Sequence, residues 1–150
     1  MIFFPTPLTL LLRKGKDKGN NGGPFEAPSE GGTFPLGQVP DLPGEHLACV
    51  TCAFPITASQ FKHYHGGDHQ FTFANPHAHI FMIMLFSYAP GVALTGSATF
   101  ENTWFQGFSW KYSLCGRCGL HLGWHFDSKK GEKFFGLISD RLVQRTSKSA

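Results

Sequence analysis

Two Cys-x-x-Cys pairs limit what this chain can fold into more than any other feature of its sequence. Cys49 and Cys52 form one pair, Cys115 and Cys118 form the other, and the 150 residues contain no further cysteine. Two thiolates from one short turn can reach the same zinc ion, and two such turns complete a tetrahedral site. The spacing therefore predicts one zinc ion bound by all four cysteines. Because four thiolates leave no open position for water or substrate, this zinc is predicted to be structural.

Other cysteine chemistry stays open on spacing alone. The pairs could be disulfides in a secreted protein, or redox-active dithiols. Neither pair opens a helix in a βαβ context, which disfavours the dithiol interpretation. A zinc ion would also join distant parts of the chain, since 62 residues separate Cys52 from Cys115. Such a link can offset the modest hydrophobic core of a small β domain.

The remaining sequence predicts an all-β domain. Its 18 glycines and 10 prolines favour many turns and short strands over long helices. The apolar run at residues 80–86 has the length of a buried strand, and Gln106-Gly107 is a plausible hairpin turn. Only the last dozen residues could be helical. Strands are predicted at residues 46–50, 60–64, 70–73, 80–86, 92–98, 100–105, 108–114, 119–126 and 133–138.

Composition divides the chain into three parts. Residues 1–40 are predicted to be a disordered or low-complexity segment, residues 41–142 the zinc-binding β domain, and residues 143–150 a flexible tail. Residues 1–12 do not have the order of a signal peptide, because the basic residues follow the apolar run. This favours a cytoplasmic or nuclear protein. No apolar run approaches the roughly 20 residues of a membrane-spanning helix, so no membrane partner is expected.

The net charge of +3 does not indicate a nucleic-acid partner. Residues 1–40 carry four basic and three acidic residues, and residues 41–140 carry six basic and seven acidic ones. The last ten residues carry three basic residues and no acidic one. The predicted domain is therefore close to neutral, whereas nucleic-acid binding needs a clustered basic surface.

All three tryptophans lie around the second cysteine pair. Trp124 and Phe126 are two residues apart, so they share a face of a strand, and the same holds for Trp110 and Tyr112. Trp104 lies on the opposite arm of the predicted hairpin from Trp110. Three converging indoles would form a box for a cation or a flat polarised ring. Aromatic residues on strands also fill ordinary cores, and spacing alone leaves both interpretations open.

The chain is rich in histidine, which raises the possibility of a second metal site. The only acidic side chain nearby in sequence is Asp68, so these histidines are predicted to be surface or loop residues: His63, His65, His69, His77 and His79. Two further histidines, His121 and His125, flank the strand that carries Trp124. They differ from it by odd numbers and are predicted to face away from it.

A set of motifs in fixed order resembles the CULT domain, the thalidomide-binding domain found at the C-terminus of cereblon and in free-standing small proteins. The resemblance covers roughly residues 45–142 and includes the first cysteine pair. The motifs are Asn75-Pro76-His77, Thr103-Trp104-Phe105-x-Gly107-x-x-Trp110, Cys115-x-x-Cys118, His121-x-Gly123-Trp124-x-Phe126 and Phe135-Gly136-Leu137.

The resemblance implies a β-tent, in which two antiparallel sheets are pinned by a four-cysteine zinc site. It also implies a pocket for a cyclic imide such as a glutarimide, or for a protein C-terminus that carries one. The resemblance implies Trp104, Trp110 and Trp124 as the cage, Phe126 at its floor, and Asn75 and Pro76 at its mouth. It also implies that main-chain groups of Asn102, Thr103 and Trp104 bind the imide edge. Asn102 departs from the family, which has a histidine there, but its side chain still offers a donor and an acceptor.

The function expected from this resemblance is ligand binding without catalysis. Only about 40 low-complexity residues precede the domain, so docking to a ubiquitin-ligase adaptor is not expected from this chain alone. Other possibilities are a reader of a uracil-type nucleoside, a methylammonium reader that uses Glu101 or Asp127, and a zinc β-tent interaction protein. A methionine sulfoxide reductase is disfavoured, because it needs a cysteine beyond the four assigned to zinc.

Overall fold

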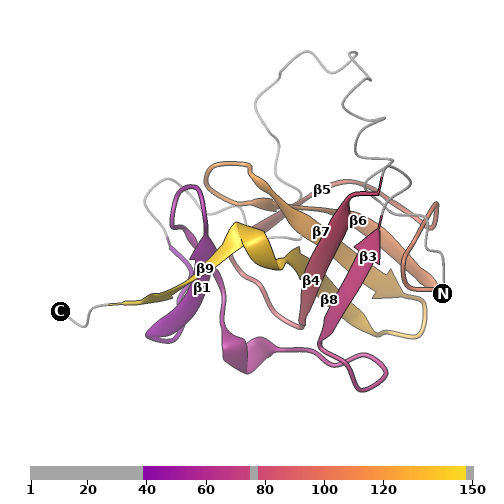
Figure 1. Ribbon diagram of the computed structural model, residues 1–150, viewed down its shortest axis with the longest axis horizontal. Helices are drawn as coiled ribbons and strands as arrows, with labels where there is room; N and C mark the ends of the chain where they lie inside the picture. Colours follow the sequence, from indigo (N-terminus) through magenta and orange to yellow (C-terminus); the bar gives the residue numbers. More distant parts are fainter. Residues whose placement is uncertain (1–38, 75–77, 148–150) are drawn as a thin grey trace, which may run out of the picture.

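The computed structural model describes residues 39–74 and 78–147, which form two antiparallel β-sheets (Figure 1). The predicted all-β class and two-sheet architecture are confirmed. Helical structure within these residues is limited to two single 3-10 turns, η1 (Ser59–Phe61) and η2 (Ser139–Arg141). No helix in these residues is long and apolar enough to cross a membrane.

The small sheet has three strands in the order β2-β1-β9. β1 (Glu45–Cys49) and β2 (Pro55–Thr57) form a hairpin that carries the first cysteine pair. β9 (Leu142–Thr146) pairs with β1 along its whole length, from Glu45 opposite Thr146 to Cys49 opposite Leu142. The two ends of the domain therefore meet in one sheet.

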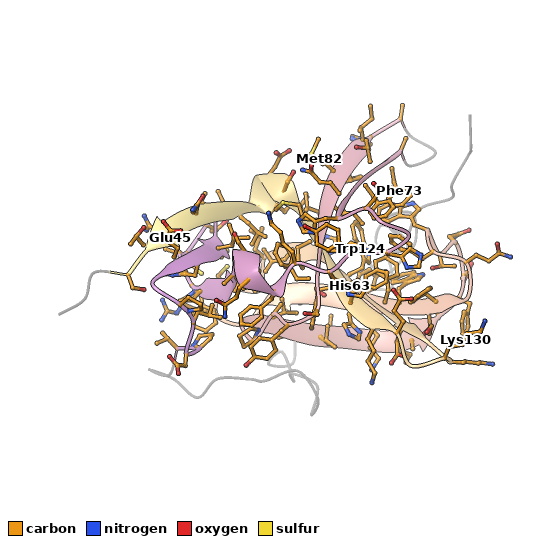
Figure 2. The ribbon with its side chains drawn as sticks, turned by 90° about the horizontal axis from the view of Figure 1, so that it is seen from below. Glu45, His63, Phe73, Met82, Trp124 and Lys130 are labelled. Atoms are coloured by element: carbon orange, nitrogen blue, oxygen red, sulfur yellow. The ribbon has the colours of Figure 1, made fainter. Side chains whose placement is uncertain are left out.

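The large sheet has six strands in the order β3-β4-β8-β7-β6-β5. Its strands are β3 (Gln70–Ala74), β4 (Ile80–Phe86), β5 (Val92–Thr99), β6 (Phe108–Cys115), β7 (His121–Ser128) and β8 (Lys133–Ile138). β6 and β7 form the hairpin that carries the second cysteine pair. Figure 2 shows the small sheet, marked by Glu45, at one end of the molecule, and the β7–β8 turn, marked by Lys130, at the other.

Two predicted strands are absent from the described residues. The stretch predicted as strand 60–64 begins in the 3-10 turn η1 and touches the large sheet only by an isolated bridge between Lys62 and Phe86. The stretch predicted as strand 100–105 is a loop, in which Asn102 has a φ of 55°. β6 therefore pairs with β5 rather than with residues 100–105, and the predicted hairpin at Gln106-Gly107 is wrong.

The C-terminal end also differs from expectation. Residues 142–146 are the strand β9 rather than a helix or the start of a flexible tail, because they pair with β1. β1 supplies their backbone hydrogen-bond partners, and it lies too far away along the chain for local sequence patterns to indicate the pairing. The expected boundary at residue 142 falls inside this pairing. Residues 1–38 and 148–150 lie outside the described part, and the disorder expected there stays a prediction.

Buried side chains form two clusters. The first, called the aromatic cluster, comes from strands β3, β4, β6, β7 and β8 of the large sheet and from the loop before β6. Its members are Phe73, Ile83, Leu85, Trp104, Phe105, Phe108, Trp110, Tyr112, Trp124, Phe126, Phe134 and Ile138. The second lies where the two sheets meet and includes Cys49, Cys115, Phe54, Ile56 and Leu122. The two sites predicted from the sequence thus lie in different parts of the core.

Candidate functional site

The four cysteines come together where the two sheets meet. Their sulfur atoms all lie within 4.8 Å of one another, although none of the four forms a disulfide. The Sγ atoms of Cys49 and Cys118 are 3.6 Å apart, as are those of Cys52 and Cys115. Tetrahedral zinc with bonds of about 2.3 Å places its sulfurs roughly 3.8 Å apart. The cysteine cluster therefore has the size of a four-thiolate metal site.

Each half of the cysteine cluster is a tight turn with the same backbone pattern. The N–H of Cys49 donates to the carbonyl of Phe54, and the N–H of Ala53 donates back to Cys49 at 2.8 Å. In the second turn, Cys115 donates to Leu120 at 2.8 Å, and Gly119 donates back to Cys115 at 3.0 Å. The backbone therefore aims each pair of thiols at one point.

A metal ion also suits the electrostatics of the cysteine cluster. Burial raises the pKa of the Cys115 and Cys118 thiols, which disfavours bare thiolates. A divalent cation compensates for that burial, because the thiolate is the form that binds metal. The residues present thus fit one metal ion held by four sulfurs.

The three tryptophans are all buried in the aromatic cluster. Trp104 is 3% exposed, Trp110 is 2% exposed and Trp124 is fully buried. The indoles of Trp104 and Trp124 pack edge to face, with ring centroids 4.7 Å apart. Trp110 lies directly across from Phe126 on the neighbouring strand and packs edge to face on Tyr112. The shared faces predicted within β6 and β7 agree with these contacts.

The loop at residues 100–107 places Trp104 in the cluster. Thr103 donates its hydroxyl to the carbonyl of Phe105 and accepts a hydrogen bond from the Phe105 N–H, which forms a local turn. The carbonyl of Glu101 accepts a hydrogen bond of 2.8 Å from Nε1 of Trp110. The loop is therefore tied to β6, and Asn102 and Thr103, both half-buried, lie directly before Trp104.

Two of the three buried indoles have an unused donor. Within the part of the chain that the structure describes, Nε1 of Trp104 and Nε1 of Trp124 are buried and have no hydrogen-bond partner. A buried donor without an acceptor costs about 1–3 kcal/mol, so such groups call for an explanation. These two N–H groups are free to donate to a ligand.

The sequence did not single out the ring that covers Trp104. Phe73 of β3 stacks on Trp104 with centroids 4.5 Å apart and an interplanar angle of 13°. Phe81 of β4 approaches Trp124 edge-on at 6.2 Å. Phe71 and Phe73 alternate along β3, which is a sequence signal for an inward aromatic face. Nothing in that signal indicates which partner the rings would meet.

His121 does not face away from Trp124 as predicted. Its ring packs edge to face on Trp124 at 5.0 Å, because the β6–β7 pairing shifts register between Ser113 and Leu114 and breaks the alternation there. Gly123, with a φ of 153°, permits this shift: a Cβ there would lie 2.1 Å from the carbonyl oxygen of Gly136. His125 does lie on the other face, against Phe135.

The protonation state of His121 follows from its partners. Its Nε2–H donates to the carbonyl of Gly123 at 2.8 Å, and its Nδ1 accepts from Arg141 at 3.2 Å. Burial, with the charge of Arg141 as a second cause, lowers the pKa of His121 to about 4. Burial is also the main cause that lowers the pKa of His125 to about 4. Both imidazoles are therefore neutral near pH 7.

The remaining predicted site residues within the described chain do not lie together. Phe126 is fully buried and packs against Phe105 at 4.8 Å, consistent with a place beneath the tryptophans. Asn75 and Pro76 lie outside the described residues. Asp127, considered above as a cage carboxylate, lies on the opposite face of β7 from Trp124 and approaches Lys133 at 3.8 Å.

Comparison with known proteins finds relatives whose similarity covers up to about half of this chain. Cereblon from Xenopus tropicalis is 34% identical over 77 residues, which cover 49% of this chain and 17% of that protein. Cereblon from Gallus gallus matches with the same identity and coverage. Cereblon from Drosophila willistoni is 33% identical over 64 residues, 37% of this chain and 10% of that protein.

The similarity thus spans less than a fifth of the length of the curated relatives. No family model matches the chain. The fold and the cysteine cluster are those expected from the motifs that carry the resemblance. Together with the cereblon relatives, they confirm the resemblance to a cereblon-like CULT domain.

Proposed function

We propose that this domain is a binding module that holds a cyclic imide of the glutarimide type against its tryptophans, with Trp104, Trp110 and Trp124 as the walls. The ligand is a free small molecule or a C-terminal cyclic imide on a peptide. One structural zinc ion in the cysteine cluster joins the two hairpins. The similarity to cereblon supports this proposal for the domain alone.

The observation that carries the proposal is the pair of buried indole N–H groups that lack acceptors among the described residues. Nε1 of Trp104 and Nε1 of Trp124 belong to rings that meet edge to face at 4.7 Å. A cyclic imide offers two carbonyl acceptors on a flat, polarised ring. Such a ring can pack against indole faces while its carbonyls meet the unused donors.

The loop before Trp104 supplies the polar partners for the imide edge. Asn102 has a φ of 55°, a conformation that asparagine adopts more readily than most residues. Its side chain carries both a donor and an acceptor. Asn102 and Trp104 add their backbone groups, while the N–H of Thr103 already donates to the carbonyl of Phe100 at 3.3 Å. An imide edge of carbonyl, N–H and carbonyl requires this mixture of donors and acceptors.

Ligand entry requires the aromatic cluster to open. Trp104 and Trp124 are at most 3% exposed, and Phe73 is the ring stacked on Trp104. The ligand therefore competes with Phe73 for the face of this indole. β3, which carries Phe73, is an edge strand that pairs only with β4 within the sheet, so it can move without breaking the rest of the sheet.

Fluorescence titration with glutarimide tests the proposal. Zinc-loaded protein is titrated while tryptophan emission is followed, and we expect saturable quenching. N-methylglutarimide is the matched control ligand, because it keeps the ring but loses the imide donor. We expect it to bind at least tenfold more weakly, since an unpaired buried partner costs about 1–3 kcal/mol.

Variants separate the pocket from the fold. Trp124→Phe removes one indole N–H and should weaken glutarimide binding about tenfold or more. Tyr88→Phe is the matched control, because Tyr88 is half-exposed and packs on Phe61, outside the aromatic cluster. No quenching at millimolar glutarimide with zinc bound would reject the proposal.

Competition distinguishes the alternative ligands. Uridine presents the same imide edge as glutarimide, and a trimethyl-lysine peptide presents a cation instead. Asp127 lies on the opposite face of β7 from Trp124, so its carboxylate does not support the methylammonium-reader hypothesis. We expect uridine, but not the trimethyl-lysine peptide, to compete with glutarimide.

A further inference from the structure

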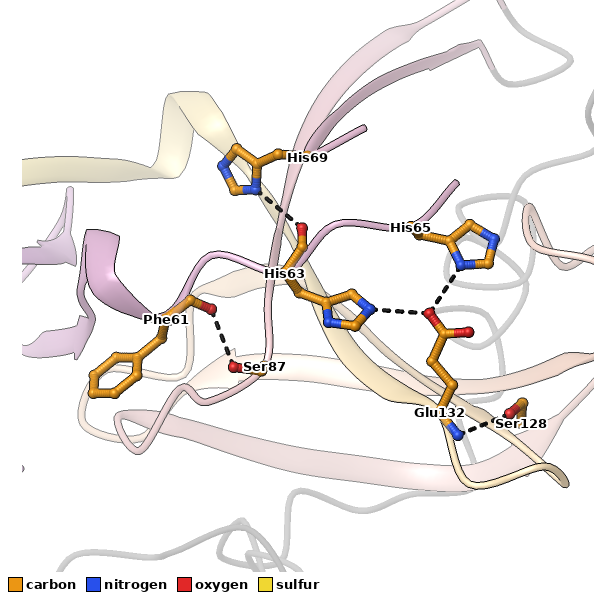
Figure 3. A network of polar contacts seen from close by, with 7 residues as sticks. All are labelled: Phe61, His63, His65, His69, Ser87, Ser128 and Glu132. Carbon is orange, nitrogen blue, oxygen red and sulfur yellow. Dashed lines mark hydrogen bonds and ion pairs between the residues drawn. The ribbon is translucent and has the colours of Figure 1, made fainter. Parts of the chain in front are cut away.

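The histidine-rich stretch that follows η1 meets a carboxylate that the sequence does not place near it. Only Asp68 is close to His63 and His65 in sequence. In the folded chain, Glu132 from the β7–β8 turn reaches both histidines (Figure 3). A carboxylate 67 residues away along the chain therefore completes a group of two imidazoles and one carboxylate.

The three side chains meet at a single oxygen atom. Oε2 of Glu132 lies 3.0 Å from Nε2 of His63 and 2.9 Å from Nδ1 of His65. Neighbouring ligands of a divalent ion with bonds of about 2.1 Å are separated by roughly 3.0–3.4 Å. The two separations between Glu132 and the imidazoles are therefore close to what one ion requires.

The backbone holds these side chains in place without a metal. The N–H of His63 donates to the carbonyl of Leu85 at 2.9 Å, and the N–H of His65 donates to the backbone carbonyl of Asp68 at 2.8 Å. The N–H of Glu132 donates to the hydroxyl of Ser128 at 3.1 Å. Each ligand is therefore carried by a segment that is anchored independently.

The rings rest on an apolar surface. His63 stacks on Phe134 at 5.0 Å, and His65 meets Phe105 and Phe108 edge-on, each at 5.4 Å. Their outer sides reach solvent: the side chains of His63, His65 and Glu132 are 22%, 33% and 39% exposed. An ion can therefore enter from water, while the phenylalanines limit how far the imidazoles can move.

We propose that His63, His65 and Glu132 form a second metal site, specific for a divalent transition metal and open to water or a further ligand. Two imidazoles and one carboxylate suit zinc or nickel and do not favour calcium or magnesium, which prefer oxygen ligands. Three protein ligands leave at least one coordination position open, unlike the four-sulfur cluster.

The carboxylate is ready to bind a cation. Its Oε2 already contacts a ring nitrogen of each imidazole, and a carboxylate has the negative charge that a cation requires. An ion there would replace two hydrogen bonds with metal bonds and link the segment after η1 to the β7–β8 turn. This site shares no residue with the proposed imide pocket, although His65 contacts Phe105, the neighbour of Trp104 in the chain.

Metal titration of the zinc-loaded protein tests the proposal. The four-cysteine site is filled with one equivalent of zinc, and Ni²⁺ or Zn²⁺ is then added in a calorimetric titration without glutarimide. We expect one further equivalent to bind, and metal analysis after gel filtration should count two ions per chain for zinc. A single ion per chain, with no binding heat, would overturn the proposal.

Variants assign the second ion to these residues. Glu132→Gln and His65→Gln should each weaken the second binding event at least tenfold, while His79→Gln should leave it unchanged. His79 is exposed and lies directly before Ile80, the first residue of β4, so it serves as the matched histidine control. Equal affinity in all three variants would place the ion elsewhere and reject the site.

The absorption spectrum of bound Co²⁺ distinguishes the two sites. Co²⁺ in the cysteine cluster gives an intense thiolate charge-transfer band, whereas Co²⁺ bound to imidazole and carboxylate has none. We expect zinc-loaded protein to take up Co²⁺ without that band. Circular dichroism of each variant shows whether the fold persists, and loss of cobalt binding in a folded Glu132→Gln protein supports the assignment.

Discussion

The cysteine cluster and the aromatic cluster are built in different ways. Each half of the cysteine cluster comes from one turn of four residues, and the two turns belong to two hairpins in different sheets. The aromatic cluster draws Phe73 from β3, Trp104 from a loop, and Trp110 and Trp124 from β6 and β7. One cluster is local and repeated, and the other is assembled from five strands of the large sheet and a loop.

This difference decides whether a substitution in one cluster unfolds the whole domain or only lowers its stability. The cysteines join the sheets at a single point, so losing one ligand should affect the whole domain. The tryptophans are distributed through a packed core, so each substitution should cost its own packing energy.

Removing one thiol should abolish cooperative folding. With Cys115→Ser only three sulfurs remain, and structural zinc binding is commonly worth 10 kcal/mol or more, which roughly matches or exceeds the stability of a small domain. We expect the variant to lose its thermal transition by circular dichroism and its bound zinc by metal analysis.

Ser113→Ala is the matched control for that experiment. Ser113 lies on the same strand, and its buried hydroxyl has no partner within the described chain, so its removal should be neutral or slightly stabilising. A thermal transition that survives in Cys115→Ser would show that the sheets hold together without the metal.

Truncating the central tryptophan should destabilise the protein without unfolding it. Trp124 is fully buried, and Trp124→Ala should lower the free energy of unfolding by about 3–5 kcal/mol. Trp124→Phe should cost less, because most of the ring volume remains. Urea unfolding of the zinc-loaded proteins measures both. A loss below 1 kcal/mol in the alanine variant would mean that Trp124 is a pocket wall with little role in the core.

Acid should weaken the aromatic cluster through His121. Its pKa is about 4 in the folded chain and ordinarily 6.5, so the unfolded chain binds more protons between these values. Stability from the neutral ring is therefore complete above about pH 6.5 and is lost as the pH falls toward 4. We expect a loss on the order of 1 kcal/mol between pH 7 and pH 5.

The variant His121→Gln isolates this contribution from the acid sensitivity of the metal site. Its unfolding free energy should fall less steeply between pH 7 and pH 5 than that of the wild type, measured by urea unfolding. His79→Gln, at an exposed position, should keep the wild-type slope. Identical slopes in all three proteins would contradict a buried neutral His121.

The smallest effect compares the two halves of the cysteine cluster. The residue after the second cysteine has a positive φ in both turns, 63° at Ala53 and 76° at Gly119. Ala53→Gly should stabilise the protein by about 0.5–1 kcal/mol, because glycine adopts this conformation without strain. Gly119→Ala should destabilise it by about 1 kcal/mol. Chemical unfolding of the zinc-loaded variants checks both signs, and matching signs would show that the turns are not equivalent.

Much of the fold follows from local sequence signals. The strands at Ile80–Phe86 and Lys133–Ile138 agree with the predicted bounds, because apolar runs between turn residues indicate strands directly. The loop at residues 100–107 was missed, since Gln106-Gly107 between aromatic residues looks like a hairpin turn. Its neighbours instead satisfy their hydrogen bonds locally and through Trp110.

Partners that are distant along the chain could not be predicted. The place of β9 beside β1 depends on pairing across almost the whole domain. The contact of His121 with Trp124 depends on a register shift, which breaks the alternation that a strand pattern assumes. Phe73 was on a predicted strand, but only the folded sheet brings its ring onto Trp104.

The sequence by itself determined the cysteine spacing, the all-β class and the motifs shared with a cereblon-like CULT domain, because each is a short-range pattern. The tertiary structure alone decided which rings and which charges meet. Glu132 shows the reason: it lies far from His63 and His65 along the chain, yet strand pairing and turn geometry bring its carboxylate within 3.0 Å of both. Spacing in sequence sets what one turn can do, and packing sets what separate turns do together.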